Sequence, residues 1–164
     1  MSKKKKPKFV TPPNRLKMLA GTGGVPDHIV ERAQKFMDNY EVDFRPEAAK
    51  LIVTMEDAAK NILDAVNENK HFEKDEIILP VMQLKANAGQ FKYQLISDVA
   101  DICLQFLEKV ENFDKEVIDI VRAHHTTIRI IIDSNLTGDG GQEGFLLVEE
   151  LHKACKRYFK KHGI

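Results

Sequence analysis

Residues 46–66 read PEAAKLIVTMEDAAKNILDAV. Apolar residues recur in this stretch at alternating spacings of four and three, at Ala48, Ile52, Met55, Ala59, Ile62 and Val66. Because an α-helix turns once in 3.6 residues, this spacing places all six side chains on one face, with charged residues between them. Pro46 suits a first helical turn. The stretch therefore predicts a long amphipathic helix that ends near residues 68–69.

The same periodicity continues on both sides of this helix. A first helix is expected from Pro26 and Asp27, a third after Asp75, and three more follow toward the C-terminus. The predicted inward positions are Ile29, Ala33, Phe36 and Tyr40; Ile77, Val81, Leu84, Ala88 and Phe91; Ile96, Val99, Cys103, Phe106 and Val110; Val117, Val121, His124, Ile128 and Ile131; and Leu147, Leu151, Ala154 and Tyr158. Pro80 lies inside the third pattern and predicts a kink or a fresh helix start there.

The run of residues 128–132, with four isoleucines, is the one stretch that also suits a strand. It continues a helical period, and no second strand candidate could pair with it, so we favour helix. The expected fold is all-α, an antiparallel four-helix bundle flanked by an N-terminal and a C-terminal helix. We expect residues 25–164 to form one helical domain, preceded by a disordered basic arm at 1–24 that is rich in proline and glycine.

The net charge of zero is a sum of opposite parts. The chain has 25 basic and 25 acidic residues, but residues 1–18 hold seven basic residues and no acid, and residues 151–164 hold five and no acid. This leaves 13 basic and 25 acidic residues, a net charge of −12, for residues 19–150. The basic arm could keep the chain in solution or dock on its own body, or it could contact an acidic protein, nucleic acid or lipid. With one aromatic residue in the arm, Phe9, nucleic acid is weakly supported.

Several classes of protein and of site are not expected. No apolar run approaches the roughly 18 residues that a membrane span needs, and the basic start lacks the apolar stretch of a secretory signal. Cys103 and Cys155 fit neither a zinc nor a redox spacing, so we expect a cytoplasmic protein. Residues 133–144 resemble a calcium loop faintly, but glycine stands at 144 where a glutamate is needed. We predict no metal and no cofactor.

A second face of the third helix is unusual because it combines apolar and small residues with a single charged residue. Its positions are Ile78, Met82, Lys85, Ala86 and Gly89. Small residues let another backbone approach closely, and methionine adapts to varied apolar partners. The pattern predicts a docking surface with Lys85 as a local positive point on an acidic body. The alternative is that another helix of the same chain covers this face.

The segment 82–91, MQLKANAGQF, resembles the signature of histidine-containing phosphotransfer (Hpt) domains. The matching positions are Leu84, Lys85, Ala88, Gly89 and Phe91, followed by Leu95 and by the pair Leu107 and Glu108. The resemblance covers about residues 46–135 and implies a four-helix bundle that meets a response-regulator receiver domain or a histidine kinase. The same segment is similar to that of small chemotaxis accessory proteins of the CheE type.

The departures from that signature bear on the chemistry. Met82 stands where the family has its phosphoacceptor histidine, Ala86 replaces a glycine and Asn87 replaces a serine. A thioether has no nitrogen that could form a phosphoramidate, and the amide of Gln83 cannot replace it. The resemblance therefore implies a non-catalytic module of phosphorelay signalling, one that keeps the docking face and lacks the phosphotransfer chemistry.

We thus expect an adaptor that is not an enzyme. Its predicted partner-binding residues are Ile78, Met82, Gln83, Lys85, Ala86 and Gly89. One alternative is an active phosphotransferase that uses His124 or His125, although both positions fall in register with apolar stripes and adjacent helix residues cannot chelate one metal together. Another alternative is a structural helical protein whose basic ends contact nucleic acid or a different acidic partner.

Overall fold

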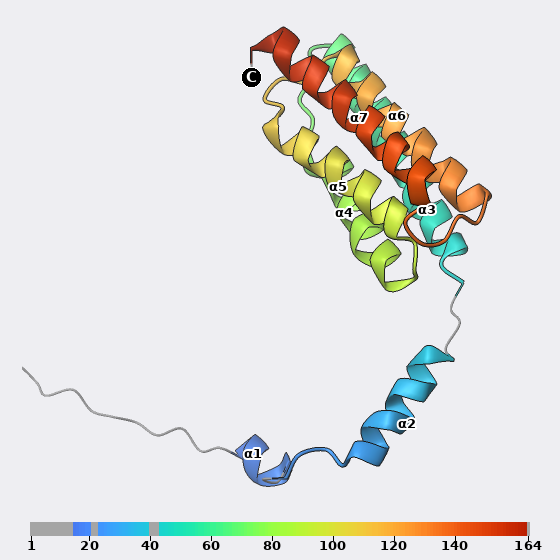
Figure 1. Ribbon diagram of the computed structural model, residues 1–164. Coiled ribbons are helices and arrows are strands. Elements are labelled where there is room, and N and C mark those ends of the chain that lie inside the picture. Colours follow the sequence, from blue (N-terminus) through green and yellow to red (C-terminus); the bar gives the residue numbers. More distant parts are fainter. Residues whose placement is uncertain (1–14, 21–22, 40–42, 164) are drawn as a thin grey trace, which may run out of the picture. The chain divides into compact units, whose positions relative to one another are not determined.

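The structure, a computed structural model, describes residues 15–20, 23–39 and 43–163. These residues contain seven helices and no strand, so the all-α prediction is confirmed (Figure 1). The chain divides into two compact units, Met1–Glu41 and Val42–Ile164. Over the described residues, no helix combines the length and the apolar character that crossing a membrane requires.

The N-terminal unit contains α1 (Arg15–Ala20) and α2 (Asp27–Asp38). The predicted disordered arm at 1–24 differs from the structure at α1, where six residues without proline or glycine form a short helix. The remainder of that arm, at 1–14 and 21–22, lies outside the described residues. The boundary between the units also falls at Glu41, beyond the predicted boundary at 24/25, so α2 belongs with the N-terminal unit.

The helix predicted from Pro26 is present, but its apolar face is not buried within its own unit. Ile29 is 49% exposed and Phe36 is 66% exposed, whereas both were predicted as inward positions. Tyr40, the last of the predicted set, lies outside the described residues. Amphipathic spacing identifies which face of a helix is apolar, but it carries no information on whether another element covers that face.

The second unit is built on four helices that pack in a ring. These are α3 (Arg45–Asn67), α4 (Asp75–Gln90), α5 (Gln94–Lys109) and α6 (Lys115–Asp133). Each packs against its chain neighbours, and α3 closes the ring by packing against α6 (Figure 1). The fifth helix, α7 (Gly141–His162), lies against α5 and α6 and thereby covers one side of the ring.

Side-chain pairs between neighbouring helices give their directions. Phe44, before α3, stacks on Phe91, after α4, with ring centroids 5.2 Å apart. Lys74 donates a hydrogen bond to the Val110 carbonyl, which joins the start of α4 to the end of α5. Lys161, near the end of α7, pairs with Glu116 in the first turn of α6 at 2.6 Å. In each case the beginning of one helix meets the end of its neighbour, so these neighbours run antiparallel.

The predicted inward positions form the core of the ring. Those fully or nearly fully buried are Ala48, Ile52, Met55, Ala59, Ile62, Ile77, Val81, Leu84, Ala88, Ile96, Val99, Cys103, Phe106, Val110, Val117, Val121, His124, Ile128, Ile131, Leu151 and Tyr158. Val66 and Phe91 are partly buried against it, and Leu147 is 37% exposed. Helix α4 continues through Pro80 without a fresh start, and residues 128–132 are helical within α6.

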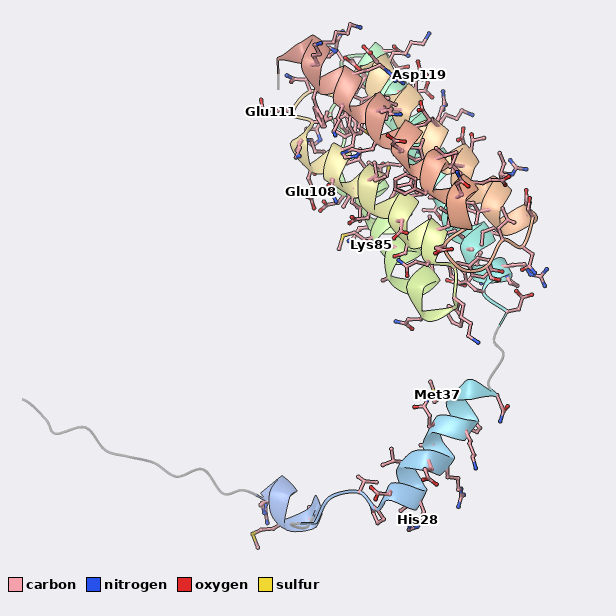
Figure 2. The ribbon with its side chains drawn as sticks, viewed as in Figure 1. His28, Met37, Lys85, Glu108, Glu111 and Asp119 are labelled. Carbon is pink, nitrogen blue, oxygen red and sulfur yellow. The ribbon has the colours of Figure 1, made fainter. Side chains whose placement is uncertain are left out.

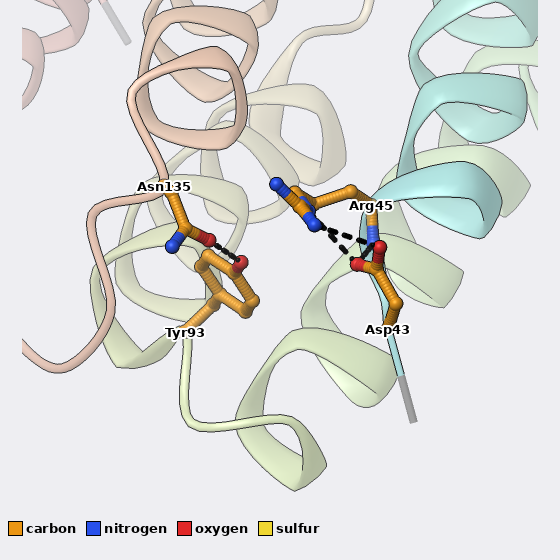
Figure 3. A network of polar contacts seen from close by, with 4 residues as sticks. All are labelled: Asp43, Arg45, Tyr93 and Asn135. Carbon is orange, nitrogen blue, oxygen red and sulfur yellow. Dashed lines mark hydrogen bonds and ion pairs between the residues drawn. The ribbon is translucent and has the colours of Figure 1, made fainter. Parts of the chain in front are cut away.

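At one end of the ring, two connections hold each other in place. The Gly138 amide donates to the Lys92 carbonyl at 2.6 Å, and the Leu95 amide donates to the Gly138 carbonyl at 2.9 Å. Tyr93 adds a hydroxyl hydrogen bond to the Asn135 side chain at 2.7 Å (Figure 3). The turn between α4 and α5 is therefore tied to the loop between α6 and α7. This fixes the start of α5, whose outer face lies beside α4.

Candidate functional site

A shallow groove runs between α4 and α5 and contains most of the predicted docking face. It has a volume of about 560 Å³ and is lined by Met82, Lys85, Ala86, Gly89 and Gln90 of α4 and by Ser97, Leu104 and Glu108 of α5. Met82 is 50% exposed, so no helix of its own unit, Val42–Ile164, covers the groove. Lys85 and Glu108 lie along the same side of the bundle (Figure 2).

The groove exists because the two helices approach closely where their residues are small. A Cβ built on Gly89 would lie 3.9 Å from the Ser97 hydroxyl, within van der Waals contact. That hydroxyl donates a hydrogen bond to the Lys85 carbonyl at 3.2 Å. The core positions of α4 point to the other side of the helix, so the groove residues need no burial to hold the fold. The groove is thus a surface that the core leaves free.

Lys85 is not the isolated positive point that the sequence suggested. Its ammonium lies 2.5 Å from one oxygen of the Asp101 carboxylate on α5. The other oxygen of Asp101 accepts a hydrogen bond from the Gln105 side chain at 2.7 Å. Lys85 and Asp101 stand 16 residues apart, so no local pattern reveals this pair. The pair neutralises the lysine and leaves the groove without a free cation among the described residues that line it.

The six predicted partner-binding residues do not all reach the groove. Met82, Lys85, Ala86 and Gly89 line it together. Ile78 is partly buried against the core and is not among the residues that line the groove, so its place in the docking face stays a prediction. Gln83 is exposed but lies outside the groove lining. The predicted residues that share the groove are therefore Met82, Lys85, Ala86 and Gly89.

The residues of α5 are the part of the site that the sequence interpretation missed. Ser97, Leu104 and Glu108 follow one another at spacings of seven and four, with Asp101 between them, and such spacing places residues on one helical face. The sequence therefore carried a signal for this wall, because the polar residues Ser97, Asp101 and Glu108 fall at helical spacing on one face of α5, together with Leu104. It did not indicate which helix of the bundle would stand opposite that stripe.

His124 is buried in the core. Its Nδ1 lies 2.8 Å from the Ile120 carbonyl oxygen and, because that oxygen can only accept, Nδ1 carries the proton. Nε2 is buried without a hydrogen-bond partner in the described part of the chain. Burial lowers the pKa of the ring below its ordinary value of 6.5, partly opposed by the bond to Ile120. A neutral, enclosed imidazole of this kind has no access to a phosphoryl donor.

His125 lies at the edge of a different pocket, between α3 and α6, with a volume of about 310 Å³. It is 8% exposed, and its Nδ1 lies 3.5 Å from the carboxylate of Glu56. Burial lowers its pKa, while Glu56 acts in the opposite direction. This pocket shares no lining residue with the groove that contains Lys85. The arrangement needed for a displaced phosphoacceptor, a histidine beside Lys85, is therefore not formed.

One group of side chains in the described residues has the geometry to hold a metal ion. Ligand atoms of Asp114, Glu116 and His162 lie within 4.8 Å of one another. All three already have structural contacts. Asp114 accepts the Val117 amide at 2.8 Å as the N-cap of α6, Glu116 pairs with Lys161, and His162 stacks on Tyr158. The hydrogen bond from Lys161 lowers the pKa of Glu116. These contacts explain the group as a tie between α6 and α7.

The two cysteines are packing residues. Both are buried and free, one on α5 and the other on α7. Burial raises the pKa of Cys155 to about 11 and raises that of Cys103 further. At neutral pH both are therefore thiols rather than thiolates, and a thiol is a poor nucleophile and a poor metal ligand.

Comparison with protein-family models finds no family that matches the chain, and comparisons with curated proteins and with solved structures find no match either.

Proposed function

We propose that the chain is a non-catalytic adaptor of two-component signalling in the cytoplasm, of the phosphorelay or chemotaxis type. It binds a receiver domain or a histidine kinase through the groove between α4 and α5. The observation that carries the proposal is the position of Met82. This residue takes the place of the phosphoacceptor in the resemblance to Hpt domains, and it is half exposed in the lining of a groove that also contains the small residues Ala86 and Gly89.

The groove supports binding and not phosphotransfer, for chemical reasons. Met82 offers an apolar contact and no nucleophile, and Ala86 and Gly89 allow a partner backbone to approach closely. Lys85, which would offset phosphoryl charge, is held by Asp101 at 2.5 Å. An adaptor with these features would occupy the docking surface of a receiver and so compete with catalytic partners, or hold the receiver near a kinase.

The test is a binding measurement with a matched pair of variants. The purified chain is titrated by calorimetry with receiver domains and histidine-kinase phosphotransfer domains of the same organism. We expect Met82→Arg to weaken binding at least about tenfold, because a buried contact becomes a desolvated charge. Ile130→Arg is the control, since Ile130 on α6 is similarly exposed, at 56% against 50%. Equal affinity of Met82→Arg and the wild type would reject the groove as the binding site.

A labelling experiment separates the adaptor from a phosphotransferase. The chain is incubated with a phosphorylated receiver and with an autophosphorylated kinase, and we expect no acid-labile label on it. Label that disappears on His125→Gln would establish phosphotransfer and overturn the non-catalytic proposal. Label that persists in both His124→Gln and His125→Gln would point to a different acceptor and would equally overturn it.

A further inference from the structure

The groove between α4 and α5 carries an electrostatic asymmetry that bears on its occupant. Three ionisable side chains stand in or beside it: Lys85, Asp101 and Glu108. The first two neutralise each other, and Asp101 has both oxygens engaged through Lys85 and Gln105. Glu108 has no ion-pair or hydrogen-bond partner among the described residues. The charge that the groove presents to a partner is therefore the single negative charge of Glu108.

The antiparallel register locates this charge at one end of the groove. Gly89 faces Ser97, Lys85 pairs with Asp101, and Lys74 contacts the Val110 carbonyl. Glu108 therefore lies beyond Lys85 toward the start of α4, on the side of the bundle where Glu111 follows it (Figure 2). The opposite end, at Gly89, Gln90 and Ser97, is uncharged. A partner thus meets an apolar floor that is neutral at one end and acidic at the other.

We propose that the groove accepts one amphipathic helix of the partner, and that Glu108 selects a helix with a lysine or arginine at one end of its apolar face. This inference rests on the proposed function and specifies its partner surface. A helix suits the floor because Met82, Ala86, Gly89 and Leu104 leave room for side chains at spacings of three and four. A basic residue suits Glu108 because opposite charges at the rim of an interface favour one partner over another. A phosphoryl group finds no free cation here.

Two synthetic peptides test the charge selection directly. Each has about 15 residues, enough for four helical turns, with leucines at spacings of three and four. One peptide carries lysine and the other glutamate at both ends of the apolar face, so either orientation presents the charge to Glu108. The ¹⁵N-labelled full chain is titrated with each peptide, and binding is followed by amide chemical shifts at low salt. We expect shifts along 82–90 and 97–108, with the lysine peptide about three- to tenfold tighter.

Charge variants exclude a general effect of the acidic body. Glu108→Lys should reverse the preference between the two peptides. Asp119→Lys on α6 is the matched control, because Asp119 is exposed and also lacks an ion-pair partner among the described residues, and it should leave the preference unchanged. Equal affinity of the wild-type chain for both peptides, or the same response to both variants, would overturn the selection by Glu108.

The outcomes distinguish this inference from the proposed function. Amide chemical-shift changes of equal size at the groove residues with both peptides would reject the role of Glu108 and leave the groove as a docking site. Absence of groove shifts with either peptide would reject the helix as occupant, and together with an unchanged receiver affinity of Met82→Arg it would reject the groove altogether.

Discussion

The ammonium of Lys85 on α4, which lines the groove, lies 2.5 Å from the carboxylate of Asp101 on α5. This pair changes what the groove can recognise, because a lysine that is already paired does not offer its charge to an anionic ligand. It also joins two helices that are already tied by the hydrogen bond from Ser97 to the Lys85 carbonyl. Whether the pair serves recognition or stability is open to measurement.

We predict that Lys85→Ala lowers the free energy of unfolding by no more than about 1 kcal/mol, because exposed ion pairs contribute little. The side chains of Lys85 and Asp101 are 44% and 38% exposed. Urea unfolding at low and high salt measures the change, with Lys50→Ala, which removes an exposed pair with Glu47, as the control. A loss above about 2 kcal/mol would show that the pair holds α4 against α5.

Two glycines should respond in opposite ways to alanine. A Cβ on Gly144 would lie 2.2 Å from the Asp139 carbonyl oxygen, so Gly144→Ala must displace backbone at the start of α7. We expect a loss of about 2–3 kcal/mol in unfolding free energy. Gly89→Ala is the matched control, because its nearest atom is 3.9 Å away, and a helical Gly-to-Ala change gains up to about 1 kcal/mol. Similar thermal midpoints for the two variants would contradict this interpretation.

The tie between the α4–α5 turn and the α6–α7 loop can be tested at Tyr93. Tyr93→Phe removes the 2.7 Å hydrogen bond to Asn135 and retains the ring that contacts Phe44. We expect a loss of about 0.5–1.5 kcal/mol, the usual net value of such a bond. Tyr158→Phe should cost less, since its hydroxyl makes no hydrogen bond among the described residues. Chemical denaturation of both variants gives the comparison, and the reverse order would be inconsistent with this tie.

Acid should weaken the fold through the buried histidines. His124 has a folded-state pKa below the ordinary 6.5 because burial disfavours the charged ring. The unfolded chain therefore binds a proton first, and stability falls as the pH drops from about 6.5 toward the folded-state pKa. The ion pair of Glu116 with Lys161 loses its contribution to stability at a lower pH, because the hydrogen bond from Lys161 holds the pKa of Glu116 below 4.5.

The variant His124→Leu should reduce this pH dependence while changing stability at neutral pH by no more than about 1 kcal/mol, since the lost bond to Ile120 is offset by removal of an unsatisfied Nε2. Urea unfolding at about pH 7.5 and about pH 5.5 measures both effects. His125, whose pKa burial also lowers, contributes to the slope that remains. An unchanged slope in His124→Leu would show that this imidazole does not control the response.

Most of the fold was accessible from the sequence because helical periodicity is a local property. The apolar stripe at 46–66 and its four successors in the bundle name 20 of the 32 buried apolar residues of the core. The failures occur where burial depends on a second element. Ile29 and Phe36 are exposed although their spacing is regular, and Ile78 is partly buried against the core although it falls in phase with Met82 and Lys85. Spacing identifies a face, and only packing decides what covers it.

The candidate site likewise has residues that one helix reveals and features that depend on the packing of two helices. Met82, Lys85, Ala86 and Gly89 could be selected from one helix, because they share a face of unusual composition. Three other features could not be selected from one helix, because each depends on which helix stands opposite and in what register. They are the second wall of the groove, the neutralisation of Lys85 and the unpaired charge of Glu108. The enclosure of His124 was indicated by its place in an apolar stripe, whereas the separation of His125 from Lys85 was not.

The sequence by itself determined the helices, their apolar faces and the absence of a nucleophile at position 82, because these follow from residue type and from 3.6-residue periodicity. Only the tertiary structure decided that Lys85 pairs with Asp101, 16 residues away, and that the Glu108 carboxylate has no ion-pair partner among the described residues. The physical reason is that the charge available at a surface is set by the distances between side chains on different helices, and those distances follow from how the helices pack.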